Sequence, residues 1–355
     1  MWQKYLVNAL KFLVFLGVGL GILYLLYTNQ NAAYQEYCAQ EGIAAEDCSL
    51  LQKVIEDFRQ ANYWWILAVL TAFTISNVSR AIRWKMLIKP LGYQPKLINA
   101  FLTTCLGYFA NLGLPRIGEV VRGGTLARYE NIRIEKVMGT IVVDRVVDVL
   151  SIIILTSVAF LIEFDTLWAF AQTYVSFGSL VILGIAGALF LGLLFALRKP
   201  ILATSFGQKI LELAKGFWQG IQTISKLENP ALFILHSVNI WFMYFLMTYL
   251  CFFAFAPTAH LSPLAGLVVF VFGAWGIVIP SPGGMGTYHF LAQTALTMYG
   301  VSGSDGFSWA NIAFFSIQLG CNVSIGILAL ILLPIINRNY NPQPIHGVSD
   351  ETATA

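Results

Sequence analysis

The chain has 355 residues, of which 57% are hydrophobic and only 11% are charged, and its mean hydropathy is +0.71. These values exclude a soluble globular domain, because several apolar runs approach the 20 residues that span a bilayer. The net charge of +3 says little about partners, and we expect no nucleic-acid partner. The composition therefore predicts an all-α polytopic membrane protein.

The first apolar run covers residues 6–27 and predicts a transmembrane helix within residues 1–28. The sequence that follows is rich in Gln and Asn and lacks a small-x-small cleavage pattern, which favours a retained span over a signal peptide. Residues 29–62 form a polar segment in which six acidic residues accompany only Lys53 and Arg59. We expect this segment to be an external loop, because Lys and Arg accumulate on the cytoplasmic side.

The five cysteines fall into two groups. Cys38 and Cys48 lie in the polar segment and would form a disulfide if their compartment is oxidising, with the reduced pair as an equal alternative. Cys105, Cys251 and Cys321 fall in apolar runs and are expected to be small buried hydrophobic residues.

The second predicted span covers residues 63–79 and is followed by basic residues alone, namely Arg80, Arg83, Lys85, Lys89 and Lys96. Residues 97–112 are apolar again, and after a Pro/Gly break at residues 111–118 another basic stretch begins. Two cytoplasmic flanks thus surround one apolar element. The pattern predicts a re-entrant hairpin of two half-helices, which membranes tolerate where protein or a water-filled cavity surrounds the break.

The third span is predicted at residues 137–162 and the fourth at 174–197. Within the connecting region 163–230, residues 208–228 place apolar side chains at three- and four-residue spacing with lysines elsewhere. This pattern is typical of an amphipathic helix in the inner membrane interface.

The fifth span is predicted at residues 231–255 and the last at 308–333. Between them lies a second split element, in which residues 264–279 and 287–299 flank a Pro-Ser-Pro-Gly-Gly-Met-Gly break. This element either returns to the outer face or crosses twice. Residues 336–355 are expected to be a disordered cytoplasmic tail.

The layout of about six spans and two hairpins assigns both termini and most of the 21 Lys and Arg residues to the cytoplasm. It also contains an internal repetition. Residues 63–162 and 231–335 each read as helix, hairpin and helix, and they begin on opposite faces. We interpret them as an inverted repeat, although hydrophobic spans also recur at such intervals by chance.

The first break carries Arg116, Glu119 and Arg122, which are either an ordinary positive flank or a receptor for an anionic headgroup. Glu119 falls in the first turn of the returning half-helix and three residues before Arg122, so we expect the two to pair.

The third span carries Asp144, Arg145 and Asp148, with the two aspartates on one helix face. Exposure to lipid would be costly there. We expect a neutralised structural cluster with Arg116 or Arg122, the alternative being a proton or headgroup relay. No nucleophile, metal-ligand set or cofactor motif accompanies the aspartates, so no metal or cofactor is expected.

The second break allows its backbone to approach a ligand closely, because it contains Pro282, Gly283, Gly284 and Gly286. His289 follows shortly after the break. It is either a pH-sensitive group or a hydrogen-bonded residue at a helix start, and we favour the latter.

At these residues the chain resembles the transmembrane region of the lysylphosphatidylglycerol synthase and flippase family. The matching motifs are Arg80-Ala-Ile-Arg-Trp84, Asn111-Leu-Gly-Leu-Pro-Arg-Ile-Gly-Glu119 with Arg122, Asp144-Arg-Val-Val-Asp148 and Pro280-Ser-Pro-Gly-Gly-Met-Gly286. Many relatives carry a glutamate where this chain has His289. In the full-length relatives, lysyl transfer belongs to a separate soluble domain for which this chain has no room.

The resemblance implies a lipid translocase in a bacterial-type plasma membrane that accepts an anionic headgroup between its hairpins. Membrane lipids are then the expected partners, with a homo-oligomer or an enzyme of lipid metabolism as further possibilities. The alternatives are a membrane-embedded transferase using Glu119, Asp144 or Asp148 as a base, and a non-transporting accessory protein. The candidate substrate-binding residues are Arg83, Asn111, Pro115, Arg116, Glu119, Arg122, Asp144, Arg145, Asp148, Pro282, Gly283, Gly284, Gly286 and His289.

Overall fold

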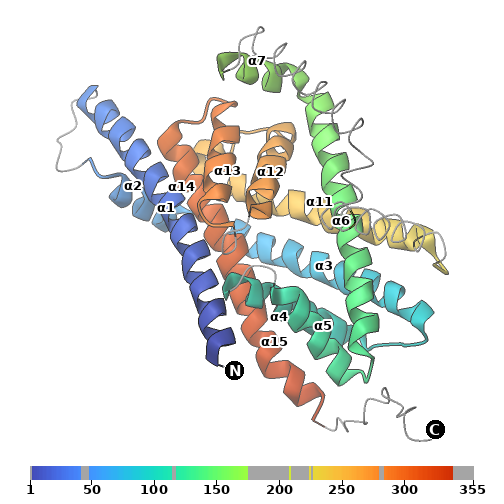
Figure 1. The fold of residues 1–355 in the computed structure, drawn as a ribbon. Helices are drawn as coiled ribbons and strands as arrows, with labels where there is room; N and C mark the ends of the chain where they lie inside the picture. Colours follow the sequence, from blue (N-terminus) through green and yellow to red (C-terminus); the bar gives the residue numbers. More distant parts are fainter. Residues whose placement is uncertain are drawn as a thin grey trace, which may run out of the picture.

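The structure is a computed structural model that describes residues 2–40, 48–113, 117–174, 227–279 and 284–338, together with residues 208 and 224. Within these ranges the regular structure is entirely helical (Figure 1). Four of the described helical segments are long and apolar enough to cross a membrane, namely Tyr63–Leu91, Ile134–Ile162, Pro230–Phe253 and Gly303–Ile336. The predicted all-α membrane architecture is confirmed, and the count of six spans stays a prediction.

The N-terminal region differs from the predicted external loop. Helix α1 (Trp2–Gln40) continues well past the predicted span, and α2 (Leu50–Gln60) occupies most of the remaining polar segment. Ser49 caps α2 by accepting a hydrogen bond from the backbone N–H of Gln52. A disulfide joins Cys38 to Cys48 with a Cα–Cα distance of 6.2 Å, so α2 is tied to the end of α1.

Two helices from the two halves of the chain run side by side in opposite directions. They are α3 (Tyr63–Ile88) and α11 (Pro230–Phe253). The backbone N–H of Asn62 donates to the carbonyl of Ala254 at 2.9 Å, and Asn239 donates to the hydroxyl of Ser79 at 2.7 Å. Short 3-10 turns follow the two helices, η1 (Lys89–Leu91) and η2 (Ala256–Thr258).

The first split element is a close pair of antiparallel half-helices, α4 (Leu97–Gly113) and α5 (Ile117–Tyr129). A Cβ added to Gly107 would lie 2.8 Å from the carbonyl oxygen of Gly118, so the backbones touch where the helices cross. At the open end, Glu130 accepts a hydrogen bond from the Asn99 side chain at 2.6 Å. The start of α4 and the end of α5 therefore lie together, as a hairpin requires.

The second split element is also a pair of half-helices, α12 (Pro263–Val278) and α13 (Thr287–Thr297). A Cβ at Gly276 would meet the backbone of Tyr288 at 2.7 Å, which again indicates direct backbone contact. The helices of the second element begin and end within two residues of the predicted limits, and the first element begins at the predicted residue 97.

The third span is α6 (Ile134–Ile162), and α7 (Phe164–Tyr174) follows it as a short helix that the sequence pattern did not indicate. The last span consists of three parts: α14 (Gly303–Phe314), the π-helical segment η4 (Phe315–Cys321) and α15 (Asn322–Ile336). The predicted fourth span and the tail beyond residue 338 lie outside the described residues, as does nearly all of the predicted amphipathic helix.

The two hairpins open toward opposite ends of the last span (Figure 1). At the open end of the first, Asn99 exchanges hydrogen bonds of 2.9 Å with Asn337, just after α15. At the open end of the second, Gln293 donates to the carbonyl of Gly303 at the start of α14. Elements α3, α4, α5 and α6 start at residues 63, 97, 117 and 134, and α11, α12, α13 and α14 start at 230, 263, 287 and 303. The order and spacing of helices are thus similar in the two halves, and their relation as an inverted repeat stays a prediction.

Both split elements contact the last span on either side of η4. In the first, Phe109 packs against Gly326, one turn into α15. In the second, the ring of His289 lies 4.7 Å from that of Phe314, the residue directly before η4. Segments of π-helix are rare and often mark functional sites.

Candidate functional site

Five charged side chains meet where α3, α5 and α6 cross. Arg83 donates to Asp144, and its guanidinium also lies 2.7 Å from Asp148. Arg80 donates to Asp148 at 2.8 Å and to Asp144 at 3.3 Å, and Arg122 donates to Asp144 at 2.8 Å. We call Arg80, Arg83, Arg122, Asp144 and Asp148 the ion-pair cluster.

The ion-pair cluster is buried, with 9% exposure or less for each residue. Arg80 and Arg83 therefore lie within the helix, although the sequence had indicated a flank beyond its end; the side of the membrane on which this end lies stays a prediction. Helix α3 continues to Ile88, and both arginines face α6 within it. Arg80 was also missing from the candidate site. Its spacing of three residues from Arg83 on one helix face was the signal that pointed to it.

Arg122 lies inside the cluster rather than on an open surface. Its guanidinium stacks on the ring of Trp84 at 4.6 Å, and the Trp84 indole donates to Thr140 at 2.9 Å. This geometry corresponds to the neutralised structural cluster that we expected for the aspartates. A role of Arg122 in binding a headgroup stays a prediction.

Arg145 and Glu119 form a second ion pair at the edge of the cluster. Their side chains are 42% and 20% exposed, so both are more accessible than the ion-pair cluster. Arg145 also approaches Asp148 at 3.6 Å. The predicted pairing of Glu119 with Arg122 is wrong, because Arg122 turns inward to Asp144 while Glu119 meets Arg145 from the neighbouring helix.

Together these residues carry four guanidinium groups and three carboxylates, which leaves one positive charge in excess. Three buried atoms have no hydrogen-bond partner within the described ranges: Arg80 Nε, Arg122 Nε and Glu119 Oε2. Buried polar atoms are nearly always satisfied, so such atoms suggest that water or a ligand approaches them. The two Nε atoms call for an acceptor, whereas the carboxylate oxygen of Glu119 calls for a donor such as water.

A chain of hydrogen bonds links the ion-pair cluster to α4 near the first hairpin tip. Arg80 donates to the hydroxyl of Tyr244 at 3.3 Å, and that hydroxyl lies 3.0 Å from the hydroxyl of Tyr108. At the tip itself, the Asn111 side chain accepts from the backbone N–H of Gly118 at 2.7 Å. Pro115 and Arg116 lie outside the described residues.

The second break is built differently. Gly284 and Gly286 have φ values of +82° and +81°, conformations that residues with a side chain adopt at a cost, while Pro282 and Gly283 lie outside the described residues. His289 is buried, and its Nδ1 accepts from the backbone N–H of Gly286 at 3.3 Å. This contact agrees with a helix-start role, and the contacts of His289 in the described part of the chain do not join it to the ion-pair cluster.

Comparison with known proteins gives a family and one relative. A family model described as "Lysylphosphatidylglycerol synthase TM region" matches residues 48–326. The UPF0104 membrane protein MJ1595 of Methanocaldococcus jannaschii is 32% identical over 101 residues, which cover 28% of this chain and 30% of that protein. No solved structure matches the chain.

Proposed function

The chain belongs to the lysylphosphatidylglycerol synthase TM region family, and from that premise we propose that it is a carrier that moves an anionic phospholipid headgroup across the membrane past its two hairpin tips.

The observation that carries this proposal is the position of two helix N-termini. Helix α5 starts at Ile117 directly after the first break, and α13 starts at Thr287 directly after the second. A helix N-terminus presents unpaired N–H groups and a partial positive charge of about half an elementary charge. Broken helices with N-termini at mid-membrane are a recurrent way of holding anionic substrate groups in transporters.

The exposed ion pair supplies a way to exchange partners. Arg145 is held by Glu119, and the surrounding charges leave one positive charge in excess. A phosphodiester that binds Arg145 would balance that charge, and Arg matches phosphate oxygens in a bidentate manner. The headgroup would be released when Glu119 regains the guanidinium.

The transferase alternative is less well supported. It needs Glu119, Asp144 or Asp148 as a base, yet each of these carboxylates is paired with an arginine. A carboxylate stabilised by a guanidinium is a weak base, because the opposite charge favours its ionised form. The pairing favours binding and passage of an anion over proton abstraction.

The test is lipid movement in reconstituted vesicles, followed by quenching of fluorescently labelled phosphatidylglycerol in the outer leaflet. We expect the protein to accelerate quenching, and Arg145→Gln to slow it at least tenfold. Arg133→Gln, which removes an exposed arginine that is 52% accessible, is the matched control. If vesicles with protein quench at the same rate as vesicles without it, for both anionic and zwitterionic labelled lipids, the carrier is ruled out.

A further inference from the structure

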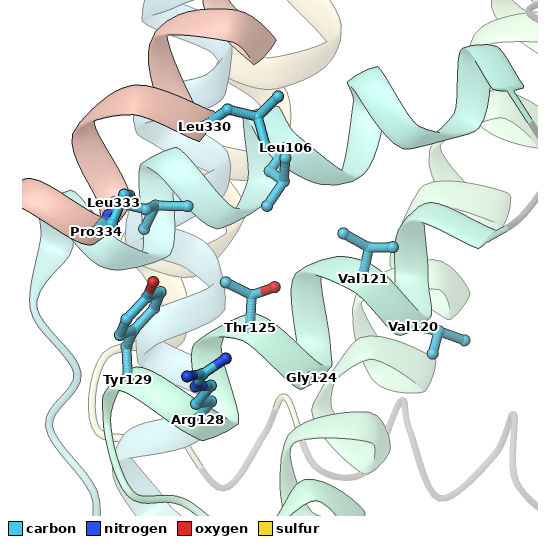
Figure 2. A pocket seen from close by; sticks show the side chains of 10 residues that line it. All are labelled: Leu106, Val120, Val121, Gly124, Thr125, Arg128, Tyr129, Leu330, Leu333 and Pro334. Atoms are coloured by element: carbon cyan, nitrogen blue, oxygen red, sulfur yellow. The ribbon is translucent and has the colours of Figure 1, made fainter. Parts of the chain in front are cut away.

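A groove of about 510 Å³ lies between α5 and α15, with α4 behind it (Figure 2). Most of its wall is apolar and comes from Leu106, Val120, Val121, Leu330, Leu333 and Pro334. Its rim is open, since Val120 is 57% and Leu330 is 49% exposed. A volume of this size falls within the usual range of small-molecule sites.

One end of the groove is polar. Arg128 in the last turn of α5 lies 6.0 Å from the ring centroid of Tyr129, and Thr125 lies one turn earlier (Figure 2). Arg128 is exposed, and no carboxylate in the described ranges forms an ion pair with it. An unpaired guanidinium beside a hydroxyl is suited to a phosphate group.

The surroundings of Arg128 are basic. The connections at this end of the hairpin and the ends of the neighbouring helices carry Lys85, Lys89, Lys96, Arg133 and Lys136 against Glu130, Glu135 and Glu228. A basic surface beside a membrane attracts anionic lipids over zwitterionic ones. The charge at this end therefore complements an anionic headgroup.

The groove has the length of one lipid leaflet. From Arg128 to Val120, α5 advances eight residues, or about 12 Å, against about 15 Å for half of the hydrocarbon core. Val120 directly follows Glu119 in α5, so the far end of the groove lies one residue along the helix from the exposed ion pair. Along this length the lining residues change from cationic to apolar, which complements an anionic phospholipid with its phosphate at one end and its acyl chains at the other.

We propose that this groove binds one anionic phospholipid from the adjoining leaflet, with its phosphate on Arg128 and an acyl chain along α5 toward the hairpin tip. The groove would supply the lipid that the proposed carrier moves, and this role as an access path rests on the proposed function. Binding itself does not depend on transport.

The experiment measures crosslinking of the purified protein to photoactivatable phosphatidylglycerol in phosphatidylcholine nanodiscs. Arg128→Gln should reduce labelling of α5 and α15 peptides about tenfold, the loss expected for one charge-assisted contact. Leu330→Trp should block the groove and reduce labelling to a similar extent. The matched controls are Arg59→Gln on α2 and Leu328→Trp, whose side chains are exposed but neither line the groove nor belong to its basic surroundings.

Four outcomes separate the possibilities. Loss of labelling in both groove variants but in neither control supports the site. Equal labelling of all variants, or equal labelling by photoactivatable phosphatidylcholine, overturns it. Groove variants that bind poorly but translocate lipid normally would refute the access path alone, and normal binding by a protein that moves no lipid would refute the carrier alone. Thermal unfolding of each variant shows that folding is retained.

Discussion

Asp144 on α6 accepts hydrogen bonds from arginines on two other helices, and Arg122 on α5 is the one that ties the first hairpin to it, at 2.8 Å. Through this carboxylate the hairpin is joined to both α3 and α6, in addition to the ion pair between Glu119 and Arg145. Replacing Asp144 should therefore lower the stability of the protein more than replacing Arg122.

We expect Asp144→Asn to be the most destabilising substitution in the cluster, costing about 3 to 5 kcal/mol, because three buried guanidiniums would lose their shared counter-charge. Arg122→Gln should cost less, about 1.5 to 3 kcal/mol, since Asp144 keeps Arg80 and Arg83. Thermal unfolding of the purified variants measures this order. If Arg122→Gln unfolds like the parent protein but abolishes lipid movement, Arg122 acts on the substrate and not on the fold.

Close contact of the hairpin backbones should make Gly118 intolerant of a side chain. A Cβ there would clash with the carbonyl oxygen of Gly107, so Gly118→Ala should lower stability by about 1 to 3 kcal/mol. Gly139→Ala on α6 is the control, because nothing lies within 4 Å of its added Cβ. A helix-propensity gain should leave the control neutral or slightly stabilised. Equal behaviour of the two variants would contradict the packed hairpin.

The disulfide between Cys38 and Cys48 should be present in protein isolated without reductant. Closing a loop of this length stabilises by about 3 kcal/mol, which should appear as weaker docking of α2 in the double Ser variant. Alkylation followed by mass measurement counts the free thiols before and after reduction. Without reductant, the unfolded protein should be alkylated only at Cys105, Cys251 and Cys321. Alkylation of two further cysteines would show that Cys38 and Cys48 are reduced.

The predicted topology places Gln52 outside, and Gln94 and Glu135 inside. All three are exposed, and the hydrogen bond between Asn99 and Glu130 keeps the two ends of the first hairpin together. We expect an impermeant thiol reagent to label a single cysteine at Gln52 from one side of the membrane and a single cysteine at Gln94 from the other. Cysteines at Gln94 and Glu135 should be labelled from the same side. Opposite sides for the last two would eliminate the re-entrant hairpin.

Both hairpins were predictable because Pro and Gly interrupt apolar runs at definite residues, so α12 starts at Pro263 and α13 at Thr287, close to the expected limits. The polar segment was harder to predict. Its charges were interpreted as a loop, although the apolar residues of Leu50–Gln60 lie at three- and four-residue spacing on one helix face, and Lys53 holds this helix to Asp305 at 2.7 Å.

The charged site was predicted in part. Asp144, Arg145 and Asp148 were recognisable as charges inside a span, but Arg80 and Arg83 resembled the basic flank that ends many spans. Whether such arginines form a flank or lie within the helix depends on Asp144 of the neighbouring helix. Because Asp144 neutralises Arg80 and Arg83, α3 can continue past them. Single-sequence patterns do not contain such contacts between helices.

The π-helical segment η4 adds backbone length within the last span without a change of direction. Deleting one residue from Phe315–Cys321 would restore an ordinary helix and rotate α15 relative to α14 by about 100°. The π-helical segment therefore sets the rotation of α15 about its axis relative to α14. One face of α14 contacts the second hairpin, and a different face of α15 contacts the first.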